Sequence, residues 1–62
     1  MARMSHYSLW NGTSWTNFEY ISDAAQAWAD EPRAVIYDNW ATEKYGVRVK
    51  IEEDDIKSVL GW

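Results

Sequence analysis

The stretch that decides the fold is residues 32–51, PRAVIYDNWATEKYGVRVKI. Its first part has the clearest apolar periodicity of the chain, at steps of three and four residues, which places those residues on one side of a helix. They are Ile36, Tyr37, Trp40, Ala41 and Tyr45. Pro32 suits the first helical position, and Gly46 suits a left-handed C-terminal cap. The pattern predicts a helix over residues 32–45 with this stripe buried.

After Gly46 the period changes to two, as expected of a strand with one buried face. The inward set is Val47, Val49 and Ile51, and the outward set is Arg48 and Lys50. An alternative stays open at residues 34–37, whose β-branched side chains could form a strand, with the helix beginning only near Asp38.

Residues 6–20, HYSLWNGTSWTNFEY, predict a β-hairpin. Asn11-Gly12 is a strong turn signal, because a type I′ turn needs positive φ at both central positions. A four-residue loop, NGTS, is the alternative register. In either register Tyr7, Leu9, Phe18 and Tyr20 share one face, and Trp10 and Trp15 share the other. Leu9 favours placing its own face inside and the two tryptophans outside.

Helical patterns flank the central stretch on both sides. Ser22 is the expected N-cap of a short helix over residues 23–31, with a packing stripe of Ala25, Trp28 and Ala29. Pro32 disfavours helical geometry at the residue before it, so we expect two short helices or one kinked helix. Residues 54–60 predict a short C-terminal helix that stops at Gly61, and an extended tail is the alternative.

These elements predict an α+β fold, a small two-layer domain in which helices cover one face of a three-stranded antiparallel sheet. The 62 residues suffice for a single domain, and we expect residues 1–4 to fray. There is no cysteine, so disulfides cannot supplement the core. The ten aromatic rings (five Trp, four Tyr, one Phe) exceed what one small core needs, so some should be exposed or lie at an interface.

Charge and motifs argue against several function classes. A net charge of −4 makes nucleic-acid binding unexpected, since that function requires a basic footprint. No apolar run is long enough to span a membrane, and no signal peptide is evident, so a cytoplasmic protein is expected. The single histidine, His6, lies near the N-terminus as an expected exposed strand residue. We therefore expect no enzyme, cofactor or metal site.

The acidic run comprises Glu52, Glu53, Asp54 and Asp55. One interpretation is a solvated turn with acids at a helix N-terminus, where the helix dipole favours them. Another is a negative patch that a basic partner surface recognises. A calcium site is a third, although the spacing of an EF-hand loop is absent.

The helix-distal face of the predicted sheet is the strongest candidate binding surface, because it would place Trp10 and Trp15 beside Arg48 and Lys50. Trp, Tyr and Arg dominate the hot spots of protein interfaces. The alternative interpretation is a solvated face with weak cation–π contacts.

Small phage-encoded proteins that bind and inhibit host enzymes resemble this chain in size, acidity and lack of a catalytic set. The hexamer WNGTSW, residues 10–15, resembles hairpin turns of phage and bacterial surface proteins. The surplus of aromatic residues, the negative charge and the lack of a catalytic set predict a non-enzymatic protein-binding module whose partner has a basic surface. The resemblance to the phage-encoded proteins implies an inhibitor or modulator of a host enzyme in nucleic-acid handling or defence. The alternatives are a module that stacks single-stranded nucleic acid or sugar on the aromatic face, and a self-associating domain such as a homodimer.

Overall fold

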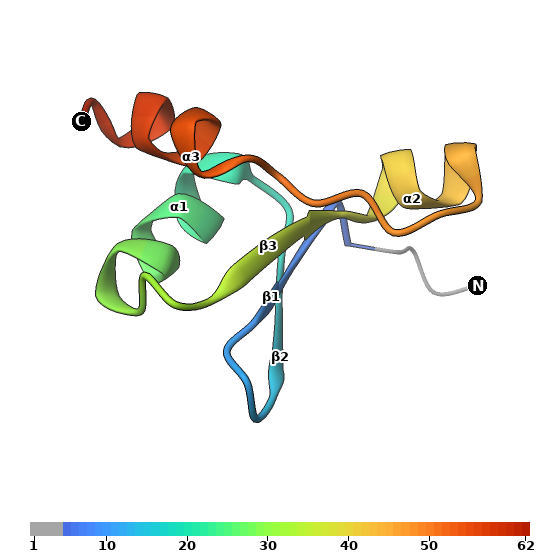
Figure 1. The fold of residues 1–62 in the computed structure, drawn as a ribbon, viewed down its shortest axis with the longest axis horizontal. Helices are drawn as coiled ribbons and strands as arrows, with labels where there is room; N and C mark the ends of the chain where they lie inside the picture. The colour runs from blue at the N-terminus through green and yellow to red at the C-terminus, as the bar shows by residue number, and fades with distance from the viewer. Residues whose placement is uncertain (1–4) are drawn as a thin grey trace.

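A computed structural model describes residues 5–62 and shows three antiparallel strands and three helices, an α+β fold as predicted. The sheet has the strand order β2-β1-β3. Helix α1 packs on all three strands and α3 packs on α1, while α2 lies at the other end of the molecule (Figure 1). The elements are β1 (Tyr7–Trp10), β2 (Trp15–Phe18), α1 (Ile21–Asp30), β3 (Val35–Asp38), α2 (Asn39–Tyr45) and α3 (Glu53–Leu60). The predicted fraying of residues 1–4 falls outside the described residues.

The hairpin has the four-residue loop rather than the two-residue turn. Trp10 pairs with Trp15 across the ladder, so residues 11–14 form the connection. The Asn11 side-chain oxygen accepts hydrogen bonds from the N–H groups of Thr13 and Ser14, both at 2.8 Å. An asparagine that bonds the backbone in this way stabilises a turn that begins at its own position. Only the glycine of the Asn11-Gly12 pair has positive φ (97°), so the type I′ prediction is wrong.

The predicted helix over residues 32–45 is wrong in its first half, and the open alternative is right. Residues 35–38 form β3, which pairs with β1 and sets Ile36 opposite Leu9 in the core. Helix α2 begins only at Asn39, because the Asp38 carboxylate accepts a hydrogen bond (3.0 Å) from the N–H of Ala41 and so caps it.

The predicted buried stripe is therefore divided. Ile36 is fully buried, but Tyr37, its neighbour on a strand, points to the opposite face. Trp40 and Tyr45 are 46% and 64% exposed, since the short helix α2 has no buried residue. The prediction of one buried helical face is therefore wrong, because its residues are divided between strand β3 and helix α2.

The predicted strand over residues 47–51 is also wrong. Gly46 does end α2 in the left-handed conformation, with φ of 72°. Beyond it, only Lys50 pairs with the edge of the sheet, in an isolated bridge to Tyr37. Val47, predicted to lie inside, is 65% exposed. The third strand of the sheet is β3, which had been assigned to the helix.

The flanking helices match the prediction in type but not in detail. Helix α1 begins at Ile21, and its N-cap is Tyr20 rather than Ser22, with no side-chain cap bond. The break before Pro32 is present, but it leads to a strand instead of a second helical segment. The C-terminal helix exists as α3, and Gly61 ends it at φ of 79°, so the extended-tail alternative is wrong.

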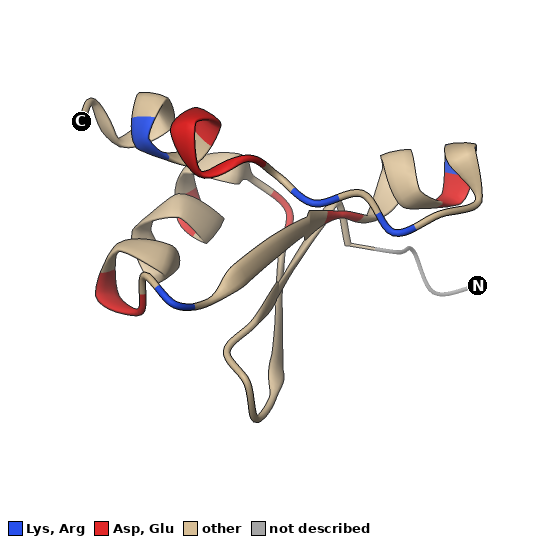
Figure 2. Cartoon of the chain, in the orientation of Figure 1, with Lys and Arg blue, Asp and Glu red and all other residues tan. Residues whose placement is uncertain are grey.

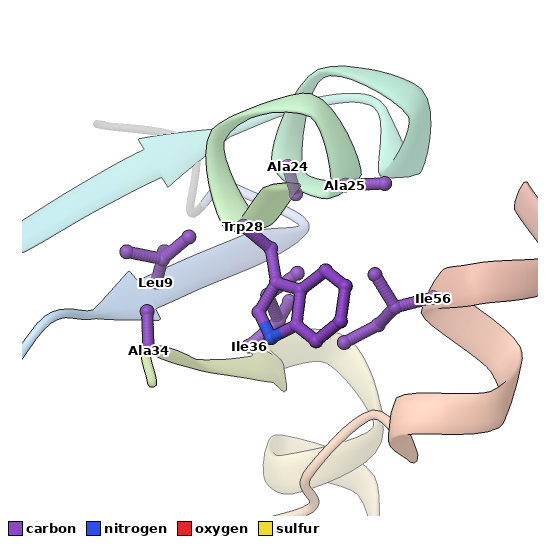
Figure 3. Close-up of a cluster of buried hydrophobic side chains, with 7 residues drawn as sticks. All are labelled: Leu9, Ala24, Ala25, Trp28, Ala34, Ile36 and Ile56. Carbon is purple, nitrogen blue, oxygen red and sulfur yellow. The ribbon is translucent and has the colours of Figure 1, made fainter. Parts of the chain in front are cut away.

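One apolar cluster lies between the sheet, α1 and α3. Figure 3 shows the Trp28 ring at its centre, with Ile56 pointing toward it from α3. The cluster comprises Leu9, Ala24, Ala25, Trp28, Ala34, Ile36 and Ile56. Of the predicted helix stripe, Ala25 and Trp28 are buried, whereas Ala29 is only half-buried and Ala24 takes its place. The two strand members of the cluster, Leu9 and Ile36, lie on the side of the sheet that faces α1 and α3.

Candidate binding surface on the outer face of the sheet

The outer face of the sheet is the side away from α1 and α3. The register sets Trp10 opposite Trp15 and Ser8 opposite both Asn17 and Tyr37, so these side chains share one face. Leu9, the neighbour of Ser8 and Trp10, is 3% exposed on the core side. The prediction that the two tryptophans lie on the face opposite Leu9 is therefore confirmed.

Four side chains on this face form what we call the aromatic–arginine cluster: Trp10, Trp15, Tyr37 and Arg48. The Trp15 ring lies 5.0 Å from Trp10 and 5.7 Å from Tyr37 between centroids, tilted by 43° and 50°. The Arg48 guanidinium lies 5.4 Å from the Trp15 centroid and 5.2 Å from the Tyr37 centroid. Both distances fall within the range of cation–π attraction.

The backbone explains why Arg48 reaches the cluster. After Gly46 the chain returns along the free edge of β3 and is held there by two hydrogen bonds. The N–H of Asp38 donates to the carbonyl of Val49 at 2.9 Å, and the N–H of Ile51 donates to the carbonyl of Ile36 at 2.8 Å. The segment is thus tied to the sheet directly beside Tyr37.

A chain of polar side chains forms the floor next to the cluster. The Ser8 hydroxyl donates to Asn17 Oδ1 at 2.7 Å, and Asn39 Nδ2 donates to Ser8 Oγ at 2.8 Å. Asn39 Nδ2 also donates to the carbonyl of Ser5 at 2.9 Å. Because β1, β2 and α2 each supply a member, these bonds fix the end of the sheet against α2.

Thr42 ties the same floor to the segment that carries Arg48. Its hydroxyl donates to the carbonyl of Asp38 at 2.8 Å and accepts from the N–H of Val49 at 2.9 Å. The position of Arg48 is therefore set by α2 as well as by β3.

Together these residues enclose an open groove of about 370 Å³. Its lining combines one cation, two aromatic side chains, two aliphatic hydroxyls and two amides, and contains no carboxylate: Ser8, Trp15, Asn17, Tyr37, Asn39, Thr42 and Arg48. Such a lining can stack on a flat group and donate hydrogen bonds to a carbonyl or an anion.

The structure brings together only part of the predicted site. Trp15 and Arg48 line the groove, and Trp10 packs against Trp15 at its side. Lys50 instead lines a second groove of about 200 Å³, together with Arg33 and Glu53. Of the two predicted cations, Arg48 is the one that lies over the Trp15 ring, while Lys50 pairs with Tyr37 at the edge of the sheet.

The acidic run lies apart from the cluster, at the start of α3 (Figure 2). Glu52 is the N-cap residue, and the other three acids occupy the first turn. All four are exposed, and Glu53 makes an ion pair with Lys57 at 3.8 Å. This placement fits the dipole interpretation of the run. Within residues 5–62, no group of three or more His, Asp or Glu side chains is placed to hold a metal ion.

His6 is not the exposed strand residue that the sequence suggested. Its ring stacks on Tyr7 and on Trp40, each at 4.0 Å between centroids. Its Nε2 atom lies 3.4 Å from the carboxylate of Asp38. Burial, together with the nearby Asp38 carboxylate, raises the pKa of the Tyr7 phenol above its ordinary value. These contacts fasten the start of β1 to α2, which supports the groove.

Sequence reasoning missed five lining residues: Ser8, Asn17, Tyr37, Asn39 and Thr42. Tyr37 could have been found by reading residues 35–38 as a strand, since Ile36 inside then requires Tyr37 outside. The two asparagines and the threonine carry no comparable signal, because the groove they line depends on where α2 packs.

In comparisons with known proteins, no family model, no curated protein and no solved structure matches this chain. In the described part of the chain, no helix has the length and apolar character needed to cross a membrane.

Proposed function

We propose that this protein is a non-enzymatic protein-binding module and that the aromatic–arginine cluster is its anchor. The observation that carries the proposal is the position of Arg48 against both Trp15 and Tyr37 on the sheet face opposite α1 and α3. Three of the residue types that dominate interface hot spots meet there, beside an open groove.

The cluster is also organised before any partner arrives. Arg48 directly precedes Val49, which is bonded to Asp38 of β3 and to Thr42 of α2, and Trp15 rests against rings on both sides. A side chain already held in place loses less conformational entropy on binding, and that loss is about 0.5–1.5 kcal/mol for a flexible one. The groove can therefore contribute to affinity with little cost of ordering.

Charge favours a partner with a basic surface. The chain has a net charge of −4, and the four acids at the start of α3 are exposed. Complementary potentials speed association and disfavour acidic competitors. A host enzyme that handles nucleic acid has such a surface, so inhibition of an enzyme of this kind, as by small phage proteins, is the specific form of the proposal.

Affinity capture with three baits tests the proposal: the wild-type chain, a Trp15→Ala/Arg48→Ala double variant, and Tyr20→Ala as the control. Tyr20 is a matched control because it is 69% exposed and lines neither groove. We expect the wild-type chain and the control to retain the same partner and the double variant to lose it. A folded double variant that retains every partner contradicts the proposal.

A second candidate function is supported by the groove itself. Its volume of about 370 Å³ and its mixture of rings, amides and a guanidinium suit a nucleobase or a sugar ring. Titration of tryptophan fluorescence with oligonucleotides and oligosaccharides at low salt tests this candidate. Saturable quenching that disappears in Trp15→Ala supports it, and no quenching removes it.

A further inference from the structure

Strand β2 leaves one backbone edge of the sheet open. It is the outermost strand of the order β2-β1-β3, and among the described strands its backbone pairs with β1 alone. Trp15, Thr16 and Asn17 are exposed, and Phe18 is half-buried. An edge of this kind is a template for another strand.

The ladder shows which backbone groups face outward. The N–H of Asn11 donates to the carbonyl of Ser14 at 3.3 Å, while His6, on the other side of β1, accepts from the N–H of Asn39 at 2.8 Å. Odd-numbered residues of β1 therefore bond toward β2, and their partners on β2 are even-numbered. The N–H and C=O groups of Trp15 and Asn17 consequently point to the open edge.

We propose that a second copy of this chain pairs with β2 in antiparallel fashion about a two-fold axis at Thr16. In this register Trp15 of one copy bonds with Asn17 of the other, and the relation is reciprocal, as a two-fold interface requires. Four outward backbone groups on each copy thereby find partners, and the sheet grows to twice its three strands.

The absence of charged side chains on β2 allows a second copy of this chain to pair with it. The protein carries a net charge of −4, yet β2 (WTNF) has no charged residue. The nearest acid, Glu19, falls opposite Thr13 of the second copy in this register, so no like charges face each other. Edge strands that avoid association are often very short or carry lysine, proline or a bulge; β2 has four residues and carries no lysine or proline.

The pairing has a consequence for the outer face. Because adjacent strands of one sheet share a face, the aromatic–arginine clusters of both copies would lie on the same side of the extended sheet. The interface uses the backbone of β2, whereas the proposed function uses the side chains of the outer face. Either idea can therefore fail without the other.

Sedimentation equilibrium over a concentration series tests the pairing. We expect the wild-type mass to rise from that of one 7.3 kDa chain toward twice that value. Thr16→Lys should lose this rise, because the two lysines would stand directly opposite each other. Thr16 is exposed, so the variant should fold, which circular dichroism checks.

Two further samples locate the axis. Ser58→Lys adds the same charge on the exposed part of α3 and should dimerise as the wild-type chain does. An equimolar mixture of Thr16→Lys and Thr16→Glu should regain the dimer, since opposite charges then meet. A monomeric wild-type chain, an unaffected Thr16→Lys dimer, or a mixture that stays monomeric would each overturn the proposal.

Discussion

Arg48 shows how far a single residue can be predicted from the sequence. Alternation after Gly46 predicts that it points away from the core, and it does lie over Trp15 and Tyr37 on the outer face. The supporting argument fails nonetheless, because Val47 is 65% exposed and the segment is not a strand. What places Arg48 is a set of long-range hydrogen bonds to Asp38, Ile36 and Thr42, which periodicity does not contain.

The side of the sheet on which Tyr37 lies could not be predicted from the sequence, for a different physical reason. Ile36 and Tyr37 are neighbours that share a face in the helical pattern and lie on opposite faces of a strand. Only the pairing of β3 with β1 decides between the two, and it sends Ile36 inward and Tyr37 outward.

Tyr7 gives a prediction on pH. Its pKa is raised in the folded state, first by burial and then by the Asp38 carboxylate. The folded state therefore holds this proton more tightly than the unfolded chain, whose tyrosines ionise near pH 10. Stability from Tyr7 is fully present below about pH 10 and is lost as the pH rises through the folded pKa. Urea unfolding at pH 8 and at pH 11 should show a smaller loss in Tyr7→Phe than in the wild-type chain; equal losses would contradict this assignment.

At the scale of elements, the boundary between β3 and α2 organises one end of the molecule. Asp38 ends the strand, caps the helix and lies 3.4 Å from His6. Its carbonyl also accepts from Thr42, whose hydroxyl fixes the segment leading to Lys50. A strand can pass directly into a helix here because the Asp38 side chain satisfies one of the free N–H groups of the first turn, that of Ala41.

Replacement of Asp38 tests this role. Asp38→Ala should lower the free energy of unfolding by about 1–2 kcal/mol, through loss of the cap and of the contact with His6. Asp38→Asn keeps a side-chain oxygen that can accept from Ala41 and should cost less. Urea denaturation monitored by circular dichroism measures both changes. If the two variants are equally destabilised, the cap is not the source of the effect.

The sequence predicts correctly those features that depend on residues close together in the chain, such as helix ends and the hairpin. The glycines at positions 46 and 61 mark helix ends, because positive φ is easily reached only without a side chain. The hairpin was predicted because aromatic runs flank Asn11-Gly12. The predicted start of α1 is two residues too late, since Tyr20 occupies the cap without any side-chain bond.

The whole molecule explains the surplus of aromatic residues. The cluster of buried residues has one aromatic member, Trp28, and small or aliphatic residues fill the rest. With helices on one side of a three-stranded sheet, the remaining rings lie at the margins or on the outer face. The prediction that ten rings exceed what one small core needs is thus confirmed, because several of them are exposed. Two of the tryptophans, Trp10 and Trp15, lie on the outer face of the sheet.

Dependence on one large ring makes the fold sensitive to its loss. Trp28→Ala should remove about 3–5 kcal/mol, against a total of roughly 3–9 kcal/mol expected at this length. We therefore expect Trp28→Ala to be largely unfolded at room temperature by circular dichroism. Trp62→Ala is the control, because Trp62 is 66% exposed and is not a member of the cluster, although its ring lies 5.8 Å from that of Trp28. A cooperative melt of Trp28→Ala near the wild-type temperature would contradict the central place of this ring.

Site-directed photo-crosslinking tests most directly whether the outer face is the contact surface. A photoreactive phenylalanine would replace Trp15 in one protein and Tyr20 in another, both exposed aromatic positions, at 47% and 69%. In a lysate that contains the captured partner, position 15 should give an adduct heavier than a dimer of this chain, and position 20 should give none. An adduct from position 20 alone would contradict the account.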